Sequence, residues 1–310
     1  MEVRFYTPAD LELWDSFIKS SRMPMFMFER GFMDYHSDRF QDASLLFFHE
    51  GQLMAVLPAS KHGCEVRSHG GLTYGGMIYG EKMKQVAMLE CFDAMIAFFH
   101  EQGIGSITYK TIPHIYHKQP AEDDLYALFV NKARLLKAEP STVINLKSPY
   151  KMPKGRKAQI SRAKREGVEI VETEDFKTFI NLENKVLKEK HGTTAVHSAD
   201  ELTLLKGRFP ENIRCLAAYL GDELIAGAIL FVYDSVVHTQ YLAADEKARE
   251  CGALDLVIAT AIDHYKCSHA FFDFGISSED NGKMLNAGLI SQKEGFGGRT
   301  NIYSTWELAI

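Results

Sequence analysis

The chain of 310 residues lacks the features that mark fibrous, disordered or membrane-spanning proteins. It has only 9 prolines while 46% of its residues are hydrophobic, which excludes collagen-like, low-complexity and disordered chains. Its first residues carry neither a basic segment nor an apolar one, so no signal peptide is predicted. No stretch of 18 residues is both uncharged and strongly apolar; the best candidate, Leu224–Tyr233, is predicted to be a buried strand.

The five cysteines form no recognisable motif. No two of them have the C-x-x-C spacing of a zinc or redox site. Their odd number and wide spacing favour reduced thiols over a disulfide framework, and we therefore expect a soluble, cytoplasmic protein. Serine-hydrolase and P-loop motifs are also missing, so neither of those enzyme classes is supported.

A basic footprint over the whole molecule is absent too, because the formal net charge is −6, and we expect no binding to DNA. One segment departs from this balance. It contains eight basic and no acidic residues: Lys147, Lys151, Lys154, Arg156, Lys157, Arg162, Lys164 and Arg165. Residues Gly155–Glu166 are predicted to be a helix that ends at Gly167. Such a helix would attract the phosphates of a diphosphate-linked sugar, of coenzyme A or of a tRNA backbone; a solvated charged surface is the alternative.

What the sequence does contain is an internal repeat. Leu45–Ser60 and Leu216–Phe231 each consist of an apolar run, a polar turn with a glycine and a second apolar run, the signature of a β-hairpin. In both halves a further strand, a helix and another strand are expected to follow. The expected helices and last strands are Glu81–Glu101 with Ser106–Lys110, and Gly252–Lys266 with Ala270–Gly275. The repeat predicts a duplicated α/β fold.

The two halves are expected to meet where prolines interrupt the chain. Pro140, Pro149 and Pro153 prevent a continuous helix there. We therefore predict one domain over residues 1–145 and another over 146–310. The apolar run Thr142–Leu146 is a candidate strand between them.

Four segments have compositions suited to binding or catalysis. The segment 249–254 offers backbone N–H groups at a predicted strand-to-helix turn, which suits a pyrophosphate. The segment 68–76 is rich in glycine, which permits close approach of a ligand; a bulged edge strand would need the same residues. The tail from Gly275 contains many glycines among polar residues, and we expect turns that lead to a final strand, Thr300–Leu308. The fourth segment contains His191 and His197, but without a third ligand no metal site is predicted.

Several of these strings together resemble one known family. They are KHGTTAVHSADELTLLKGRFPENI, GDELIAGAILF, HTQYLAAD and DFGISSEDNGKMLNAGLISQKEGFGGRT. They resemble the Fem-type branch of the GNAT acyltransferase superfamily, most clearly over Lys154–Leu308. GRKAQISRAKREGVEI and SHGGLTYGGMIYG are similar to segments of its second and first halves. The resemblance implies tandem GNAT-like domains and transfer of an acyl group from aminoacyl-tRNA or acyl-CoA to an amine or hydroxyl, with no tightly bound cofactor.

The sequence departs from that family at two places. The acyl-CoA loop of the superfamily reads Q/R-x-x-G-x-G/A; Arg249 and Gly252 match it as cofactor-binding candidates, but Leu254 stands at the last position. Some Fem-type enzymes carry a long helical arm, for which the stretch Phe176–Arg208 is too short.

Transfer from an activated ester or thioester needs a deprotonated nucleophile about 3–3.5 Å from the carbonyl carbon and a donor for the oxyanion. We therefore predict direct attack without an acyl-enzyme. Asp273 or Glu294 is the expected base, and Tyr303 the expected proton donor to the leaving group. The predicted substrate-binding residues are Lys293, Arg299, Gln240, Tyr241, Ser68, His69, Tyr74, Lys154 and Arg156.

The expected function is acyl or aminoacyl transfer to a cell-envelope precursor, either a peptidoglycan peptide or a nucleotide- or lipid-linked sugar. An acyl-CoA-dependent N- or O-acyltransferase of polysaccharide biosynthesis is the first alternative, and a GNAT-shaped binding protein without catalysis is the second. The expected partners are the envelope precursor and, as a candidate, aminoacyl-tRNA. Peripheral attachment to a membrane remains open.

Overall fold

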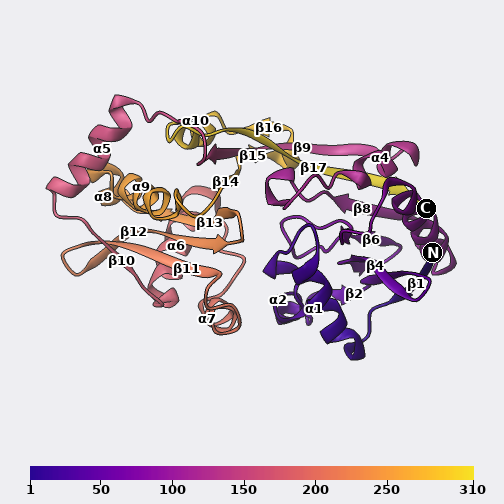
Figure 1. Ribbon diagram of the computed structural model, residues 1–310. Helices are drawn as coiled ribbons and strands as arrows, with labels where there is room; N and C mark the ends of the chain where they lie inside the picture. The colour runs from indigo at the N-terminus through magenta and orange to yellow at the C-terminus, as the bar shows by residue number, and fades with distance from the viewer. The chain divides into compact units, whose positions relative to one another are not determined.

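The computed structural model describes the backbone of residues 1–310 and the side chains of all of them except Lys190 and His191. The chain divides into two compact units. Unit 1 comprises Met1–Pro140, Ser278–Met284 and Ile302–Ile310, and unit 2 comprises Ser141–Ser277 and Leu285–Asn301. Figure 1 labels the elements of both. No helix in the described part of the chain is long and apolar enough to cross a membrane.

Unit 2 is built on a mixed sheet of six neighbouring strands. They are β10 (Glu169–Glu172), β11 (Ile213–Leu220), β12 (Glu223–Val232), β13 (Val236–Ala244), β14 (Phe271–Ile276) and the end of β9 (Arg134–Asn145). All neighbours are antiparallel except β13 and β14, which are parallel. The predicted hairpin is confirmed in β11 and β12, and its turn contains Gly221 at φ 61°.

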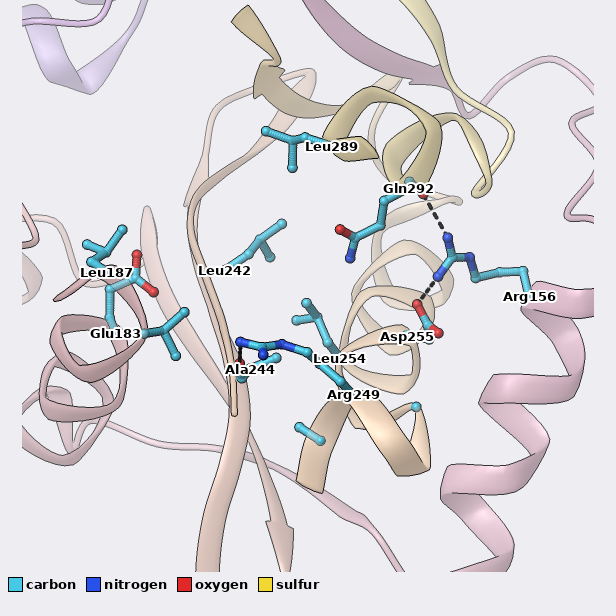
Figure 2. A pocket seen from close by; sticks show the side chains of 13 residues that line it. Arg156, Glu183, Leu187, Leu242, Ala244, Arg249, Leu254, Asp255, Leu289 and Gln292 are labelled. Atoms are coloured by element: carbon cyan, nitrogen blue, oxygen red, sulfur yellow. Dashed lines mark hydrogen bonds and ion pairs between the residues drawn. The ribbon is translucent and has the colours of Figure 1, made fainter. Parts of the chain in front are cut away.

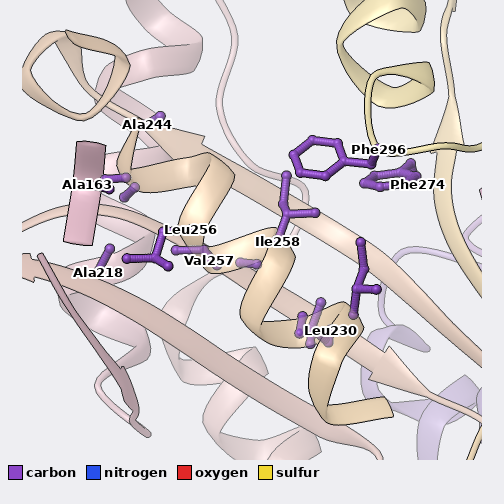
Figure 3. Close-up of a cluster of buried hydrophobic side chains, with 14 of the residues drawn as sticks. Ala163, Ala218, Leu230, Ala244, Leu256, Val257, Ile258, Phe274 and Phe296 are labelled. Atoms are coloured by element: carbon purple, nitrogen blue, oxygen red, sulfur yellow. The ribbon is translucent and has the colours of Figure 1, made fainter. Parts of the chain in front are cut away.

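Two helices cover opposite faces of this sheet. The helices of unit 2 are α5 (Lys154–Arg165), α6 (Phe176–His191), α7 (Ala199–Arg208), α8 (Glu246–Cys251), α9 (Ala253–Tyr265) and α10 (Ala287–Glu294). The core of the unit joins Leu256 and Val257 of α9 to Leu230 of β12 (Figure 3). A side chain at Gly227 would instead lie 3.0 Å from Phe179 of α6. Since successive residues of a strand point to opposite faces, α6 covers the face opposite to α9.

The parallel pair β13–β14 is short, and this shapes the site described below. Residues Val236–His238 pair with Phe271–Asp273. Beyond His238, the remainder of β13 as far as Ala244 has no pairing with β14 in the described backbone. The two strands therefore separate toward their carboxyl ends, which opens the sheet at that edge.

Unit 1 repeats much of this order. A four-stranded antiparallel sheet contains β1 (Glu2–Phe5), β3 (Leu45–His49), β4 (Gln52–Leu57) and β7 (Ile78–Tyr79). A second group contains β2 (Gln41–Asp42), β5 (Ser60–His62), β6 (Glu65–Arg67), β8 (Ser106–Lys110) and the end of β17 (Arg299–Ala309). The helices are α1 (Leu11–Ser20), α2 (Arg30–Met33), α3 (Gln85–Glu101) and α4 (Asp123–Val130), and β15 (Ser278–Glu279) pairs with β16 (Met284–Leu285).

The predicted duplication is confirmed by these elements. The hairpin β3–β4, strand β7, helix α3 and strand β8 recur in unit 2 as β11–β12, β13, α9 and β14. The strand that pairs with the last member of each set comes from outside the repeat. Residues Ser141–Asn145 of β9 pair with β14, and Thr305–Ala309 of β17 pair with β8. The end of the chain thus completes the sheet of unit 1, and the units are not contiguous in sequence. Two contiguous domains, 1–145 and 146–310, remain a prediction.

Two sequence predictions of local structure are wrong. The tail after Gly275 is not a set of turns only, because α10 forms within it. Asn286 is the N-cap of this helix and accepts a hydrogen bond from the Leu289 amide. The cap was not predicted because Asn286 is one of many polar residues in this part of the sequence. Arg249 does not lie in a turn between strand and helix either. It lies within α8, which starts at the N-cap Asp245 and ends at Gly252.

Candidate active site

A pocket of about 430 Å³ lies in unit 2, beside the part of β13 that is not paired with β14. Its walls come from five helices and one strand, and Figure 2 shows the side chains that line it. The lining residues are Leu242 and Ala244 of β13, Glu183, Val186 and Leu187 of α6, Ala248 and Arg249 of α8, Leu254 and Asp255 of α9, Leu289 and Gln292 of α10, Arg156 of α5, and Gly252. Most of them are apolar, and the charged side chains stand at separate points of the wall.

The residues of the predicted acyl-CoA loop meet at one side of this pocket. Arg249 Nη2 donates a 2.9 Å hydrogen bond to the Ala244 carbonyl. Gly252 joins α8 to α9 at φ +81°, and a Cβ there would lie only 2.7 Å from the Gln159 carbonyl oxygen of α5. Glycine is therefore required at this position by the backbone and by the approach of α5. Leu254 lines the pocket in the first turn of α9, where the superfamily pattern has glycine or alanine.

Arg156 connects three helices at the pocket wall. Its Nη1 forms an ion pair with Asp255 of α9, and its Nη2 donates to the Gln292 carbonyl of α10 at 2.9 Å. The guanidinium also lies over the Phe296 ring, 4.4 Å from its centre. Burial raises the pKa of the Asp255 carboxyl, and the charge of Arg156 opposes this. Lys154, predicted with Arg156 to bind substrate, is exposed at the start of α5.

Tyr241 is fixed on the α6 side of β13. Its hydroxyl accepts a hydrogen bond from the His197 amide at 3.1 Å and lies 2.7 Å from Nδ1 of the same histidine. Burial raises the pKa of Tyr241, and the carboxylate of Glu183 acts in the same direction. Gln240 is half-buried beside it. Glu183, only 6% exposed, lines the pocket but was not predicted, because one acidic residue in an amphipathic helix has no recognisable pattern.

Asp273 lies on β14, and Lys293 of α10 contacts the end of the same strand. The fully buried Asp273 Oδ1 accepts hydrogen bonds from Ser141 Oγ at 2.5 Å and from the Gly275 amide at 3.0 Å. Its Oδ2 lies 3.2 Å from Nδ1 of His238. Lys293 Nζ donates to the carbonyls of Gly275 at 2.9 Å and Ile276 at 2.6 Å. His238 and Ser141 were not among the residues predicted from the sequence.

Glu294 and Arg299 are both exposed, and neither lines the pocket. Arg299 Nη1 donates to the adjacent Gly298 carbonyl at 2.6 Å. The structure therefore brings Arg249, Gly252 and Arg156 together at the pocket wall. Asp273 and Lys293 form a second group of residues. The catalytic and binding roles of these five residues stay predictions.

The remaining predicted residues lie in unit 1. Ser68 Oγ accepts from the Lys110 amide at 2.7 Å, and Lys110 Nζ donates to the His69 carbonyl at 2.8 Å. Burial, reinforced by the nearby His36 and Lys110, lowers the pKa of His69 to about 3. Tyr74 and Tyr303 are buried with their ring centres 5.5 Å apart in an edge-to-face contact.

No metal centre is found among the described residues, since none of their His, Cys, Asp and Glu side chains form a group of three suited to an ion. His191 and His197 were the two histidines considered as metal ligands from the sequence. The side chain of His191 lies outside the described residues. His197 instead bonds to Tyr241.

Comparison with known proteins identifies the part of the chain that contains the pocket. Residues 154–281 match the family model described as the acetyltransferase (GNAT) domain. This segment resembles a GNAT acetyltransferase domain. It contains the separated strands β13 and β14 and most of the pocket wall. No curated protein matches the chain in sequence.

Solved structures extend the likeness to the whole chain. FemX superposes with a TM-score of 0.70 at 11% identity, covering 100% of this chain and 98% of FemX. The C-terminal domain of a protein assigned as a lysylphosphatidylglycerol synthetase from Agrobacterium fabrum gives 0.64 at 12% identity, with 97% and 91% covered. A tandem GNAT protein from the clavulanic acid biosynthesis pathway gives 0.53 at 10% identity, with 99% and 98% covered.

These comparisons confirm the predicted fold and reaction class. The chain has the tandem GNAT fold shared with FemX, and the match of residues 154–281 to the GNAT domain supports an acyltransferase. At such low sequence identity the structural likeness establishes the fold and leaves the substrates open.

Proposed function

We propose that the protein transfers an acyl or aminoacyl group to an amine or hydroxyl of a cell-envelope precursor, and that the activated donor binds in the pocket of unit 2. The observation that carries this proposal is the opening between β13 and β14 with a pocket of about 430 Å³ beside it, inside a GNAT acetyltransferase domain. The Fem-type resemblance supports an envelope precursor as acceptor. A structural neighbour assigned as a lysylphosphatidylglycerol synthetase is consistent with this choice.

The pocket suits a donor with an extended apolar or weakly polar acyl part. Leu187, Leu242 and Leu289 form apolar walls, and Arg249 supplies an exposed cation at the rim. A thioester or tRNA ester is already activated. The protein needs to hold the donor against the nucleophile and to exclude water, with direct attack as the simplest chemistry.

Within this proposal, the wall at the start of α9 favours an aminoacyl ester over acyl-CoA. A pyrophosphate approaches helix N-termini through bare backbone amides and a positive local charge. Here Leu254 covers the first turn of α9, and Asp255 neutralises Arg156. Acyl-CoA remains the second candidate donor, because the matched GNAT domain and the residues Arg249 and Gly252 favour it.

The donor is tested by transfer assays with the purified chain. The donors are a mixture of transfer RNAs charged with radiolabelled amino acids and, in parallel, radiolabelled acetyl-CoA. The acceptor is a nucleotide-linked muramyl peptide. We expect label to pass from the charged tRNA to the peptide. Transfer from acetyl-CoA alone would identify the second candidate donor, and no transfer from either would overturn the proposal.

A pocket-filling variant links that activity to the site. Leu187→Trp places an indole in the pocket wall and should reduce transfer at least tenfold. Leu204→Trp is the matched control, because Leu204 lies on α7, is 45% exposed and does not line the pocket. It should retain transfer within twofold. Equal activity of the two variants would place the donor elsewhere.

A further inference from the structure

A histidine that the sequence analysis did not single out forms a dyad with Asp273 at the point where β13 and β14 separate. His238 and Asp273 are register partners at the last paired position of these strands. Nδ1 of His238 lies 3.2 Å from Asp273 Oδ2. Because a carboxylate only accepts hydrogen bonds, the ring proton of neutral His238 sits on Nδ1, and Nε2 keeps its lone pair.

The carboxylate of this dyad is held from several sides. Ser141 Oγ and the Gly275 amide both donate to Asp273 Oδ1. With 0% of its surface exposed, Asp273 is enclosed and has no route to a substrate. Asp273 can fix the orientation and the tautomer of the imidazole. Carboxylates bonded to histidine do the same in metal sites, where the other ring nitrogen is the reactive one.

His238 is 6% exposed, and its outer nitrogen is the one that Asp273 does not contact. None of the described side chains forms a hydrogen bond with Nε2. Nε2 is also absent from the fully buried side-chain atoms that lack a partner in the described part of the chain, so it reaches space accessible to solvent. A Cβ on residue 275 would lie 3.3 Å from Cε1 and 3.9 Å from Nε2, so glycine at this position avoids a close contact with that edge of the ring.

The dyad does not line the pocket, but His238 lies on the same strand as the pocket residues Leu242 and Ala244. Leu242, on the pocket wall, is four residues beyond His238 on β13. At about 3.3 Å per residue, the two are roughly 13 Å apart along the strand. The part of β13 that is not paired with β14 connects them, and an extended acyl group following this opening is the path by which a carbonyl carbon would come to His238.

We propose that His238 is the general base of the reaction and that Asp273 is its positioning residue; this rests on the proposed acyl transfer. Nε2 takes the proton of the attacking amine or hydroxyl as the new C–N or C–O bond forms. The bond from the acyl carbon to the leaving oxygen or sulfur breaks, and His238 returns the proton to that leaving atom. No proton is gained or lost by the protein over the cycle.

The test compares variants in the transfer assay with charged tRNA or acetyl-CoA, whichever the wild type uses. His238→Ala should lower kcat by about 10²- to 10⁴-fold and leave the acceptor KM within about twofold. Added imidazole should restore part of the rate to His238→Ala in a saturable manner. Asp273→Asn should also lower kcat with little change in KM, and imidazole should not rescue it. His264→Ala, an exposed histidine on α9, is the matched control and should match the wild type.

The outcomes separate this inference from the proposed function. If the wild type transfers an acyl group and His238→Ala keeps the rate within twofold, His238 is not the base although the transferase proposal stands. A slow His238→Ala that imidazole fails to rescue, with a melting temperature equal to the wild type, also overturns the inference. If His238→Ala does not fold, His238→Gln replaces it, and near-normal activity of that variant has the same meaning. A wild type inactive with both donors removes both proposals.

Discussion

At the scale of the residue, Lys293 provides hydrogen bonds to backbone carbonyls near the point where two strands separate. The Gly275 and Ile276 carbonyls lie beyond the last paired position of β13 and β14, and buried carbonyls require hydrogen-bond donors. The Lys293 ammonium supplies them from α10 while only 5% exposed. Burial lowers the pKa of Lys293 from its ordinary 10.5 to about 8, although the charge of Asp273 opposes the shift.

This pKa makes the stability depend on pH. Between pH 8 and 10.5 the unfolded chain binds a proton at Lys293 that the folded protein has released. The free energy of unfolding therefore rises with pH through this interval, by at most about 3 kcal/mol from this one group. Chemical denaturation of the wild type and of Lys293→Met should be measured at several pH values. As the pH rises through this interval, the free energy of unfolding of the wild type should increase relative to that of the variant.

The exposed Lys151 supplies the control for that measurement. The difference between the wild type and Lys151→Met should stay constant over the same pH range. A flat difference for Lys293→Met as well would mean that the ammonium of Lys293 is not buried as the structure has it.

At the scale of the element, α5 combines an exposed cationic surface with one buried attachment. Arg162 pairs with Glu166 on the exposed surface of the helix, whereas Arg156 pairs with Asp255 of α9. A double-mutant cycle with Arg156→Met and Asp255→Asn should give a coupling energy above about 1 kcal/mol, since the pair is largely buried. The cycle with Arg162→Met and Glu166→Gln should give about 0.5 kcal/mol or less. Urea denaturation measures both, and equal couplings would contradict a structural role for Arg156.

The elements and the site differ in how far the sequence predicts them. Hairpins and the long helix α9 follow from periodicity and turn residues, and their predicted bounds differ little from those observed. The short helices α8 and α10 are missed because their capping residues lie among other polar residues. Arg249 and Gly252 are recognisable by their spacing. His238, Ser141 and Glu183 are single polar residues in apolar surroundings, and only strand register and helix packing bring them near Asp273 or the pocket.

At the scale of the whole molecule, the exchange of strands decides where the chain can be cut. The boundary predicted at residue 145 falls directly after the residues of β9 that pair with β14. A fragment of residues 146–310 would lose that strand and expose β14, with the buried Phe272, as an open sheet edge. It would also keep the part of β17 whose partner β8 lies in the other half. Such unpaired edges favour aggregation.

Cutting the chain by its units instead of its repeats should therefore give the better-folded fragment. Residues 141–301 retain Ser141–Asn145 beside β14 and omit Ile302–Ile310 of unit 1; of unit 1 they keep only the short segment Ser278–Met284. We expect this fragment to melt cooperatively as a monomer, and the fragment 146–310 to aggregate or to melt at a lower temperature without a sharp transition. Calorimetry and size-exclusion chromatography of the two would decide the matter. A fragment 146–310 as stable as 141–301 would show that the β9 strand is dispensable, and that two contiguous domains describe the chain better than two units completed by strands from beyond each repeat.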